Sequence, residues 1–63
     1  MQIIKCENTV HSIITLSNNE RYERCAYKDN INWIKINCGE YPQLITNPSI
    51  IKELNDAFTV YTN

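Results

Sequence analysis

The alternation of apolar and polar positions predicts strands over the first two thirds of the chain. Apolar side chains recur at every second position in several short segments, and polar pairs rich in Asn separate them. Such a pattern is typical of half-buried strands joined by tight turns. We therefore expect strands over residues 2–6, 9–17, 20–28 and 31–38, connected as an up-and-down meander.

The third of these segments is compatible with two structures. Tyr22, Cys25 and Ala26 share one face of a helix, whereas Tyr22, Arg24 and Ala26 share one face of a strand. Aromatic content and the short spacing to the next segment favour a strand within a hairpin. Asn18 and Asn19 suit a two-residue loop before it, and residues 28–30 suit a turn after it.

Residues 47–58 carry the clearest structural signal and predict a helix. Asn47 can cap its start, and Pro48 suits the first helical position. One contiguous apolar stripe follows, made of Ile50, Ile51, Leu54, Ala57 and Phe58. A helix of about three turns is marginal alone in water, so we expect this stripe to pack on the sheet. Residues 59–63 are again β-prone and predict an edge strand or a docked tail.

The last predicted strand is apolar on both faces, so the choice of the face under the helix matters. Ile34 and Ile36 share one face, and Ile31 and Trp33 share the other. We expect the helix to cover the face that carries Val10, Ile14, Leu16, Ile34 and Ile36. The other face then retains a surplus apolar and aromatic surface. The predicted class is α+β, a small antiparallel meander of three or four strands with one C-terminal amphipathic helix packed on one face.

Length and composition restrict the kind of protein further. With 63 residues, 43% hydrophobic and 21% charged, the chain is expected to form a single small domain over residues 1–63. Domains of this size often gain stability from disulfides, a metal or a second subunit. No apolar run approaches the roughly 20 residues that span a bilayer, and a basic start with a long apolar region is lacking. We therefore predict a cytoplasmic protein that does not contact membranes.

The cysteines predict thiols and no metal. Cys6, Cys25 and Cys38 are odd in number, which leaves one thiol over in any disulfide framework. Together with His11 they have the atoms for a zinc site, but a close pair such as C-x2-C is absent. We expect reduced cysteines, no metal and no cofactor. The sequence leaves open whether these four residues converge.

The chain also lacks a recognisable catalytic pattern. His11 is the single histidine, and its neighbour Ser12 points to the opposite face if both lie on one strand. A pairing of His11 with Cys25 or Cys38 across the sheet is conceivable, but the sequence does not favour it. Gly39 is the single glycine, so a glycine-rich phosphate-binding loop is excluded. We predict that the chain is not an enzyme.

Basic and aromatic residues alternate in residues 21–35, and this segment carries the predicted binding surface. The residues assigned to a partner contact are Tyr22, Arg24, Tyr27, Ile31, Trp33 and Lys35. Tyr, Trp and Arg dominate the energetics of protein interfaces. We therefore expect a non-catalytic protein-binding module whose partner is a host or cognate protein, or a second copy in a homodimer. The richness in Ile, Asn and Lys is typical of AT-rich coding sequences, which phages and low-GC bacteria share. The small chain without a catalytic pattern and its surplus apolar and aromatic surface favour a small phage or mobile-element protein that inhibits or redirects a host macromolecule.

The same hairpin supports an alternative function, the binding of single-stranded nucleic acid. Arg21, Arg24, Lys28 and Lys35 would contact phosphates while the aromatic rings stack on bases. Acidic residues in the same region and a net charge of -1 weigh against this alternative. The sequence identifies neither the partner nor the oligomeric state.

Overall fold

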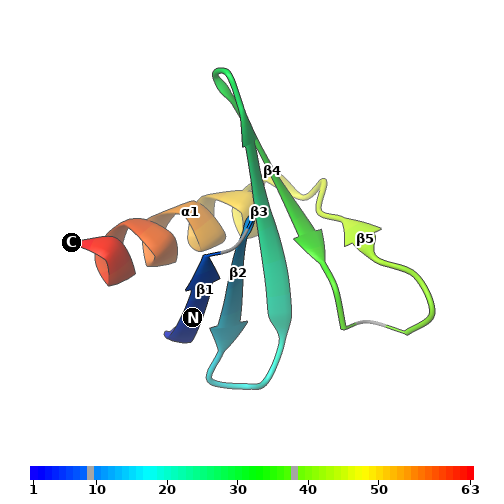
Figure 1. Cartoon of the computed structure of the whole chain (residues 1–63), viewed down its shortest axis with the longest axis horizontal. Coiled ribbons are helices and arrows are strands. Elements are labelled where there is room, and N and C mark those ends of the chain that lie inside the picture. The colour runs from blue at the N-terminus through cyan, green and yellow to red at the C-terminus, as the bar shows by residue number, and fades with distance from the viewer. Residues whose placement is uncertain (9, 38) are drawn as a thin grey trace.

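Five antiparallel strands and one C-terminal helix make up the fold (Figure 1). The computed structural model describes residues 1–8, 10–37 and 39–63. The elements in chain order are β1 (Ile3–Asn8), β2 (Ser12–Leu16), β3 (Arg21–Tyr27), β4 (Asn30–Lys35), β5 (Gln43–Leu44) and α1 (Pro48–Thr62). Each strand pairs with its neighbour in sequence, so the sheet order is β1-β2-β3-β4-β5. The predicted α+β meander with a C-terminal helix is confirmed, and β3 is a strand. The additional strand, β5, lies between the predicted strand over residues 31–38 and the predicted helix.

The β2–β3 connection determines which side chains share a face of the sheet. The prediction of a two-residue loop is wrong, because residues 17–19 form a three-residue loop. The backbone N–H of Leu16 donates to the carbonyl oxygen of Glu20 at 2.8 Å, and Asn19 has a φ of 70°. A left-handed residue at the end of such a loop is a known hairpin solution that asparagine tolerates. Ile14 consequently lies opposite Tyr22. A two-residue loop would instead have placed Glu23 opposite Ile14.

This shift of one residue exchanges the faces of β3 and β4 relative to β2. Trp33 lies opposite Arg24, which lies opposite Ser12, so Trp33 shares a face with Ile14. Trp33 has no exposed surface and Tyr22 is only 5% exposed. The predicted surplus surface through Tyr22 and Trp33 is therefore wrong, because α1 covers the face on which these side chains lie.

The prediction of which residues lie under the helix is correct for β2 and wrong for the other residues. Ile14 and Leu16 belong to the buried core. Val10 lies in the β1–β2 connection and is 91% exposed, because β2 begins only at Ser12. Ile34 and Ile36 are half-buried and are not among the side chains packed around the core. Ile34 lies opposite Glu23 and so points to the face of the sheet that α1 leaves open.

The core between the sheet and α1 is small and centred on an aromatic pair. Its buried side chains are Ile3, Ile14, Leu16, Tyr22, Trp33 and Leu54. The Trp33 ring meets the Phe58 ring edge-on, with centroids 6.1 Å apart. Its indole N–H donates to Oδ1 of Asn55 at 2.7 Å, so the polar atom of the buried ring is satisfied from the helix. The apolar stripe of α1 therefore packs against the Trp33 face of the sheet.

The helix begins as its sequence predicts and continues further than expected. The Asn47 side chain accepts a hydrogen bond from the backbone N–H of Ser49 at 2.9 Å, and Pro48 is the first helical residue. The prediction of a β-like end is wrong, since α1 runs to Thr62. The Thr59 hydroxyl donates to the Asn55 carbonyl oxygen at 2.9 Å, which satisfies this β-branched residue within the helix. Over the residues described, no helix has the length and apolarity needed to cross a bilayer.

An ion pair ties the β2–β3 loop to β4. Oε2 of Glu20 lies 2.5 Å from Nζ of Lys35, and the Asn18 side-chain amide donates to Oε1 of Glu20 at 2.7 Å. The hydrogen bond from Lys35, followed by that from Asn18, holds the pKa of Glu20 below its ordinary value. The ionised carboxylate is thus favoured in the folded chain.

We expect acid to weaken the fold through Glu20. A carboxyl group whose pKa is lower in the folded state contributes stability that is fully present above its unfolded pKa and is lost as the pH falls through its folded pKa. The Glu20→Gln variant should therefore lose less of its free energy of unfolding on acidification than the unmodified chain. Urea denaturation at neutral and acidic pH measures this difference. An identical acid-induced loss in both proteins would contradict the role of this ion pair.

Candidate functional site

The outer part of the β3–β4 hairpin, residues 25–32, projects beyond the rest of the sheet (Figure 1). We call this part the distal hairpin. The pairing of β2 with β3 stops at Arg24, whereas β3 and β4 stay paired up to Tyr27 and Asn30. A two-residue turn closes the tip, with Lys28 at a φ of 54°. Among the strands that the structure describes, none pairs with the outer edges of the distal hairpin.

Two large apolar side chains are exposed on the distal hairpin. Tyr27 is 70% exposed and Ile31 is 40% exposed. Tyr27 lies opposite Asn30 and Ile31 lies opposite Ala26, so the two side chains point to opposite faces of the hairpin. The ammonium group of Lys28 lies 5.5 Å from the centroid of the Tyr27 ring. The distal hairpin therefore presents an apolar side chain on each face.

The six residues predicted to contact a partner fall into three structural classes. Tyr22 and Trp33 are buried in the core. Arg24 and Lys35 are half-buried and hold the hairpin to the rest of the fold. The Arg24 guanidinium lies 4.6 Å from the centroid of the Phe58 ring, and Lys35 forms the ion pair with the β2–β3 loop. The remaining two, Tyr27 and Ile31, are the exposed pair on the distal hairpin.

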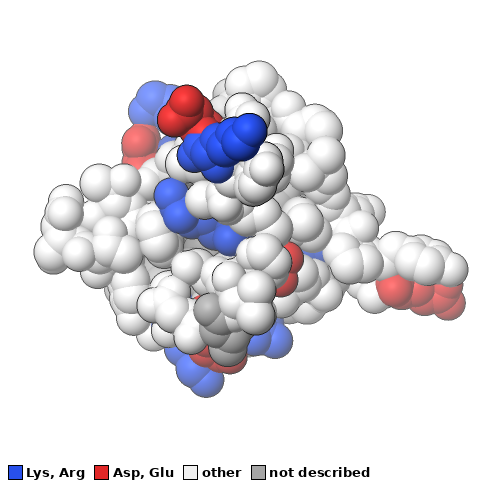
Figure 2. All heavy atoms as spheres, turned by 45° about the horizontal axis from the view of Figure 1, so that its top comes forward, with Lys and Arg blue, Asp and Glu red and all other residues white. Residues whose placement is uncertain are grey.

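The cations proposed to contact phosphates are largely engaged within the fold. An amino nitrogen of the Arg21 guanidinium lies 3.3 Å from Oε1 of Glu7, Arg24 stacks on Phe58, and Lys35 is held in its ion pair. Figure 2 shows small basic clusters with acidic neighbours on a mostly uncharged face. Tyr22 and Trp33, two of the rings that would stack on bases, are buried, so the geometry gives little support to a single-stranded nucleic-acid platform.

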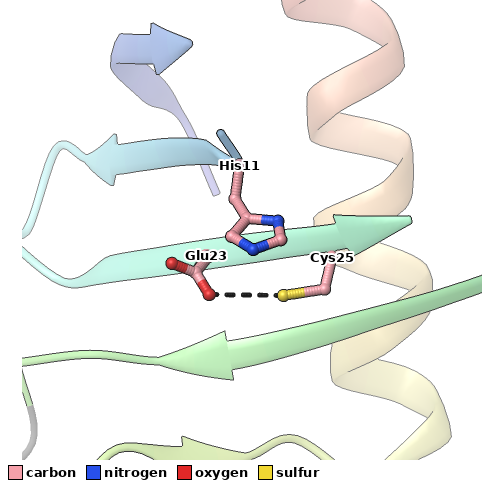
Figure 3. Close-up of side chains that lie close together, drawn as sticks. All are labelled: His11, Glu23 and Cys25. Atoms are coloured by element: carbon pink, nitrogen blue, oxygen red, sulfur yellow. Dashed lines mark hydrogen bonds between the residues drawn. The ribbon is translucent and has the colours of Figure 1, made fainter. Parts of the chain in front are cut away.

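A second cluster, made of His11, Glu23 and Cys25, lies on the face of the sheet opposite α1. Figure 3 shows the imidazole of His11 lying over β3 beside the other two side chains. The imidazole nitrogen, carboxylate oxygen and sulfur ligand atoms all lie within 4.8 Å of one another. The Cys25 thiol donates to Oε1 of Glu23 with a sulfur-to-oxygen distance of 3.3 Å.

The cluster answers part of the question that the sequence left open. His11 and Cys25 converge, and Glu23, which was not among the predicted ligands, joins them. Cys6 lies opposite Ile14 on the face that α1 covers, and Cys38 lies outside the described residues. Both described cysteines are free thiols. The spacing of Glu23 and Cys25 signals a shared strand face, but the placement of His11 beside them depends on the hairpin register.

The thiol of this cluster is not set up as a nucleophile. Burial, followed by the hydrogen bond to Glu23 and the charge of its carboxylate, raises the pKa of Cys25. Nucleophilic cysteines act as thiolates and need the opposite change, a lowered pKa. The hydrogen bond to a carboxylate holds the proton on sulfur, which argues against a cysteine–histidine catalytic pair.

An open groove of about 470 Å³ lies between the N-terminal residues and the last turns of α1. Ile3, Ala57 and Val60 supply apolar surface, and Glu53 and Asp56 add carboxylates. The Asp56 carboxylate pairs with Lys52 one helical turn earlier, at 2.7 Å. The groove thus combines apolar walls with solvated acidic groups, and the described residues that line it include no serine, cysteine or histidine.

Comparisons with protein-family models, with curated proteins and with solved structures returned no match.

Proposed function

We propose that the chain is a non-catalytic protein-binding module that contacts its partner through the distal hairpin. The observation that carries this proposal is the exposure of Tyr27 and Ile31 on a two-stranded projection. Transfer of apolar surface from water into an interface is favourable, and tyrosine is enriched among the residues that dominate binding energy. The partner is a protein with an apolar cleft wide enough for a β-hairpin.

The base of the hairpin supports this role because it is fixed to the core. Trp33 and Tyr22 are buried where the hairpin meets the sheet, and Arg24 stacks on Phe58 of α1. A segment that is already ordered loses little conformational freedom on binding, and this preorganisation improves affinity. The buried side chains of Tyr22 and Trp33 thus fix the base of the hairpin on which Tyr27 and Ile31 are exposed.

We propose further that the chain comes from a phage or mobile element. The AT-rich type of composition supports an origin in a phage or mobile element. In that setting the partner is a host macromolecule, and a hairpin that fills its cleft would inhibit or redirect it. The engaged cations of the hairpin make a protein a better candidate than a nucleic acid.

We expect Tyr27→Ala to weaken partner binding by about 30-fold, the effect of losing a side chain that contributes about 2 kcal/mol to an interface. The tagged chain would first capture its partner from a lysate of a low-GC bacterium, with and without nuclease treatment. Titration calorimetry with the purified partner would then compare the unmodified chain, Tyr27→Ala and Ile31→Ser. Val60→Ala is the matched control, because Val60 is an apolar residue of α1 that is 76% exposed and distant in sequence from the hairpin.

The outcomes separate the candidate functions. Loss of binding in both hairpin variants, with Val60→Ala unaffected, would support the proposal. Equal binding by all variants would exclude the distal hairpin as the contact surface. Capture that disappears with nuclease and weakens steeply with salt would favour nucleic acid instead. If size-exclusion chromatography shows a dimer that Tyr27→Ala dissociates, the partner is a second copy of the chain.

A further inference from the structure

We propose that His11, Glu23 and Cys25 form a zinc-binding site on the open face of the sheet. This inference is independent of the proposed protein-binding function, because it concerns a different cluster of side chains. It rests on the convergence of the three ligand atoms within 4.8 Å of one another (Figure 3).

The strand pairing explains why these three side chains meet. Glu23 and Cys25 are two residues apart on β3, so both point to the face opposite α1. Ser12 lies opposite Arg24, and His11, one residue earlier, therefore comes beside Cys25, one residue later. Two of the ligands thus stand on a paired strand, and the third stands where the β1–β2 connection enters β2.

The set of donor atoms fits zinc better than calcium or magnesium. Zinc binds cysteine sulfur, histidine nitrogen and carboxylate oxygen at about 2.0 to 2.3 Å. Calcium and magnesium prefer oxygen ligands, and a thiolate with an imidazole is a poor site for either. Three protein ligands leave a fourth tetrahedral position for water or for an atom from another molecule.

The geometry needs only a small contraction to hold the ion. Ligand atoms of a tetrahedral zinc site lie about 3.5 Å apart, as the bond lengths require. The sulfur and the carboxylate oxygen are already 3.3 Å apart. The imidazole of His11 is on an exposed residue, so rotation of its side chain can bring its nitrogen to the same ion.

Binding replaces the present hydrogen bond with metal–ligand bonds. The S–H bond of Cys25 breaks, its proton leaves to solvent, and a sulfur–zinc bond forms. The Glu23 carboxylate loses the hydrogen bond from the thiol and binds the ion through an oxygen. His11 binds through a ring-nitrogen lone pair and Glu23 through a carboxylate oxygen, and no oxidation state changes. Zinc bound in this way would fasten the β1–β2 connection to β3, next to the base of the distal hairpin.

The test uses the untagged, reduced chain with cobalt as a spectroscopic probe for zinc. We expect one cobalt ion per chain, a sulfur-to-cobalt charge-transfer band, the strong visible bands of tetrahedral cobalt, and displacement of the cobalt by zinc. Cys25→Ser should abolish the charge-transfer band. His11→Ala and Glu23→Gln should each weaken zinc binding at least about tenfold. Cys6→Ser is the matched control, because Cys6 is a half-buried thiol on the other face of the sheet.

Several results would overturn the proposal. One is the absence of the charge-transfer band in the unmodified chain. A band that survives in Cys25→Ser or is lost in Cys6→Ser would also overturn it. So would an unchanged zinc affinity in both His11→Ala and Glu23→Gln. Circular dichroism shows whether each variant is folded. X-ray absorption of the zinc-bound, unmodified chain needs no variant and should show one sulfur ligand with nitrogen and oxygen ligands. Two or more sulfur ligands would exclude this site.

Discussion

Trp33→Ala is expected to remove about 3 to 5 kcal/mol from the free energy of unfolding, the usual cost of truncating a large aromatic in a core. Trp33 has no exposed surface, and its ring packs edge-on against Phe58. The substitution also leaves Oδ1 of Asn55 without the indole N–H that it now accepts from. At about 0.05 to 0.15 kcal/mol per residue, a chain of this size has only about 3 to 9 kcal/mol of stability. Most of the fold should therefore be lost.

Urea denaturation followed by far-ultraviolet circular dichroism measures this loss, since the variant lacks the single tryptophan needed for fluorescence. Tyr27→Ala is the matched control on the same hairpin, and its exposed side chain should change stability by no more than about 0.5 kcal/mol. If Trp33→Ala were as stable as Tyr27→Ala, Trp33 would not be a core residue. The prediction that Trp33 contacts a partner would then gain support.

The helix shows how much a local signal can predict. Asn47 as cap, Pro48 in the first turn and the apolar stripe that includes Leu54 are all where the sequence predicts them. Each of these features depends on residues within one or two turns, which the sequence shows directly. The extension to Thr62 was missed because residues 59–62 are β-prone, and continuation of an established helix overrides such a weak preference.

The faces of the sheet could not be predicted in the same way. In β4, Trp33 and Ile34 are adjacent and both apolar, so alternation alone leaves either face available for the core. The choice follows from the β2–β3 loop, where one extra residue and the left-handed Asn19 place Tyr22 opposite Ile14. Asparagine pairs allow loops of either length. The large ring of Trp33 is buried in the result, and the smaller Ile34 is left half-covered.

The same register explains which parts of the candidate sites were missed. The exposed side chains of Tyr27 and Ile31 lie near the turn of a hairpin that extends beyond the sheet, so their exposure does not depend on the β2–β3 loop. Their faces do depend on it, and Ile31 lies on the Trp33 face, which was predicted to be free of the helix. Tyr22 was misplaced because its face depends on that loop. The meeting of His11 with Cys25 joins residues on different strands, and it follows only once the register is known. Sequence patterns therefore predict elements here better than they predict contacts between them.

Leu54→Ala is expected to cost about 2 to 5 kcal/mol, the range for truncating a leucine in a packed core. Leu54 has no exposed surface, and it is the one residue of α1 that is buried, so the docking of the helix depends strongly on it. A 15-residue helix is marginal in isolation. Loss of docking should therefore unfold the helix together with the sheet, in a single cooperative transition.

Val60→Ala provides the control within the same helix, because Val60 is 76% exposed. Alanine has the higher helix propensity, so this variant should be as stable as the unmodified chain or slightly more stable. Urea denaturation followed at the helical circular dichroism signal compares the three proteins. Equal stabilities of Leu54→Ala and Val60→Ala would mean that α1 packs through another face. A large loss in Leu54→Ala alone would show that the contact of one leucine with the Trp33 face of the sheet holds the helix, and with it the base from which the distal hairpin projects.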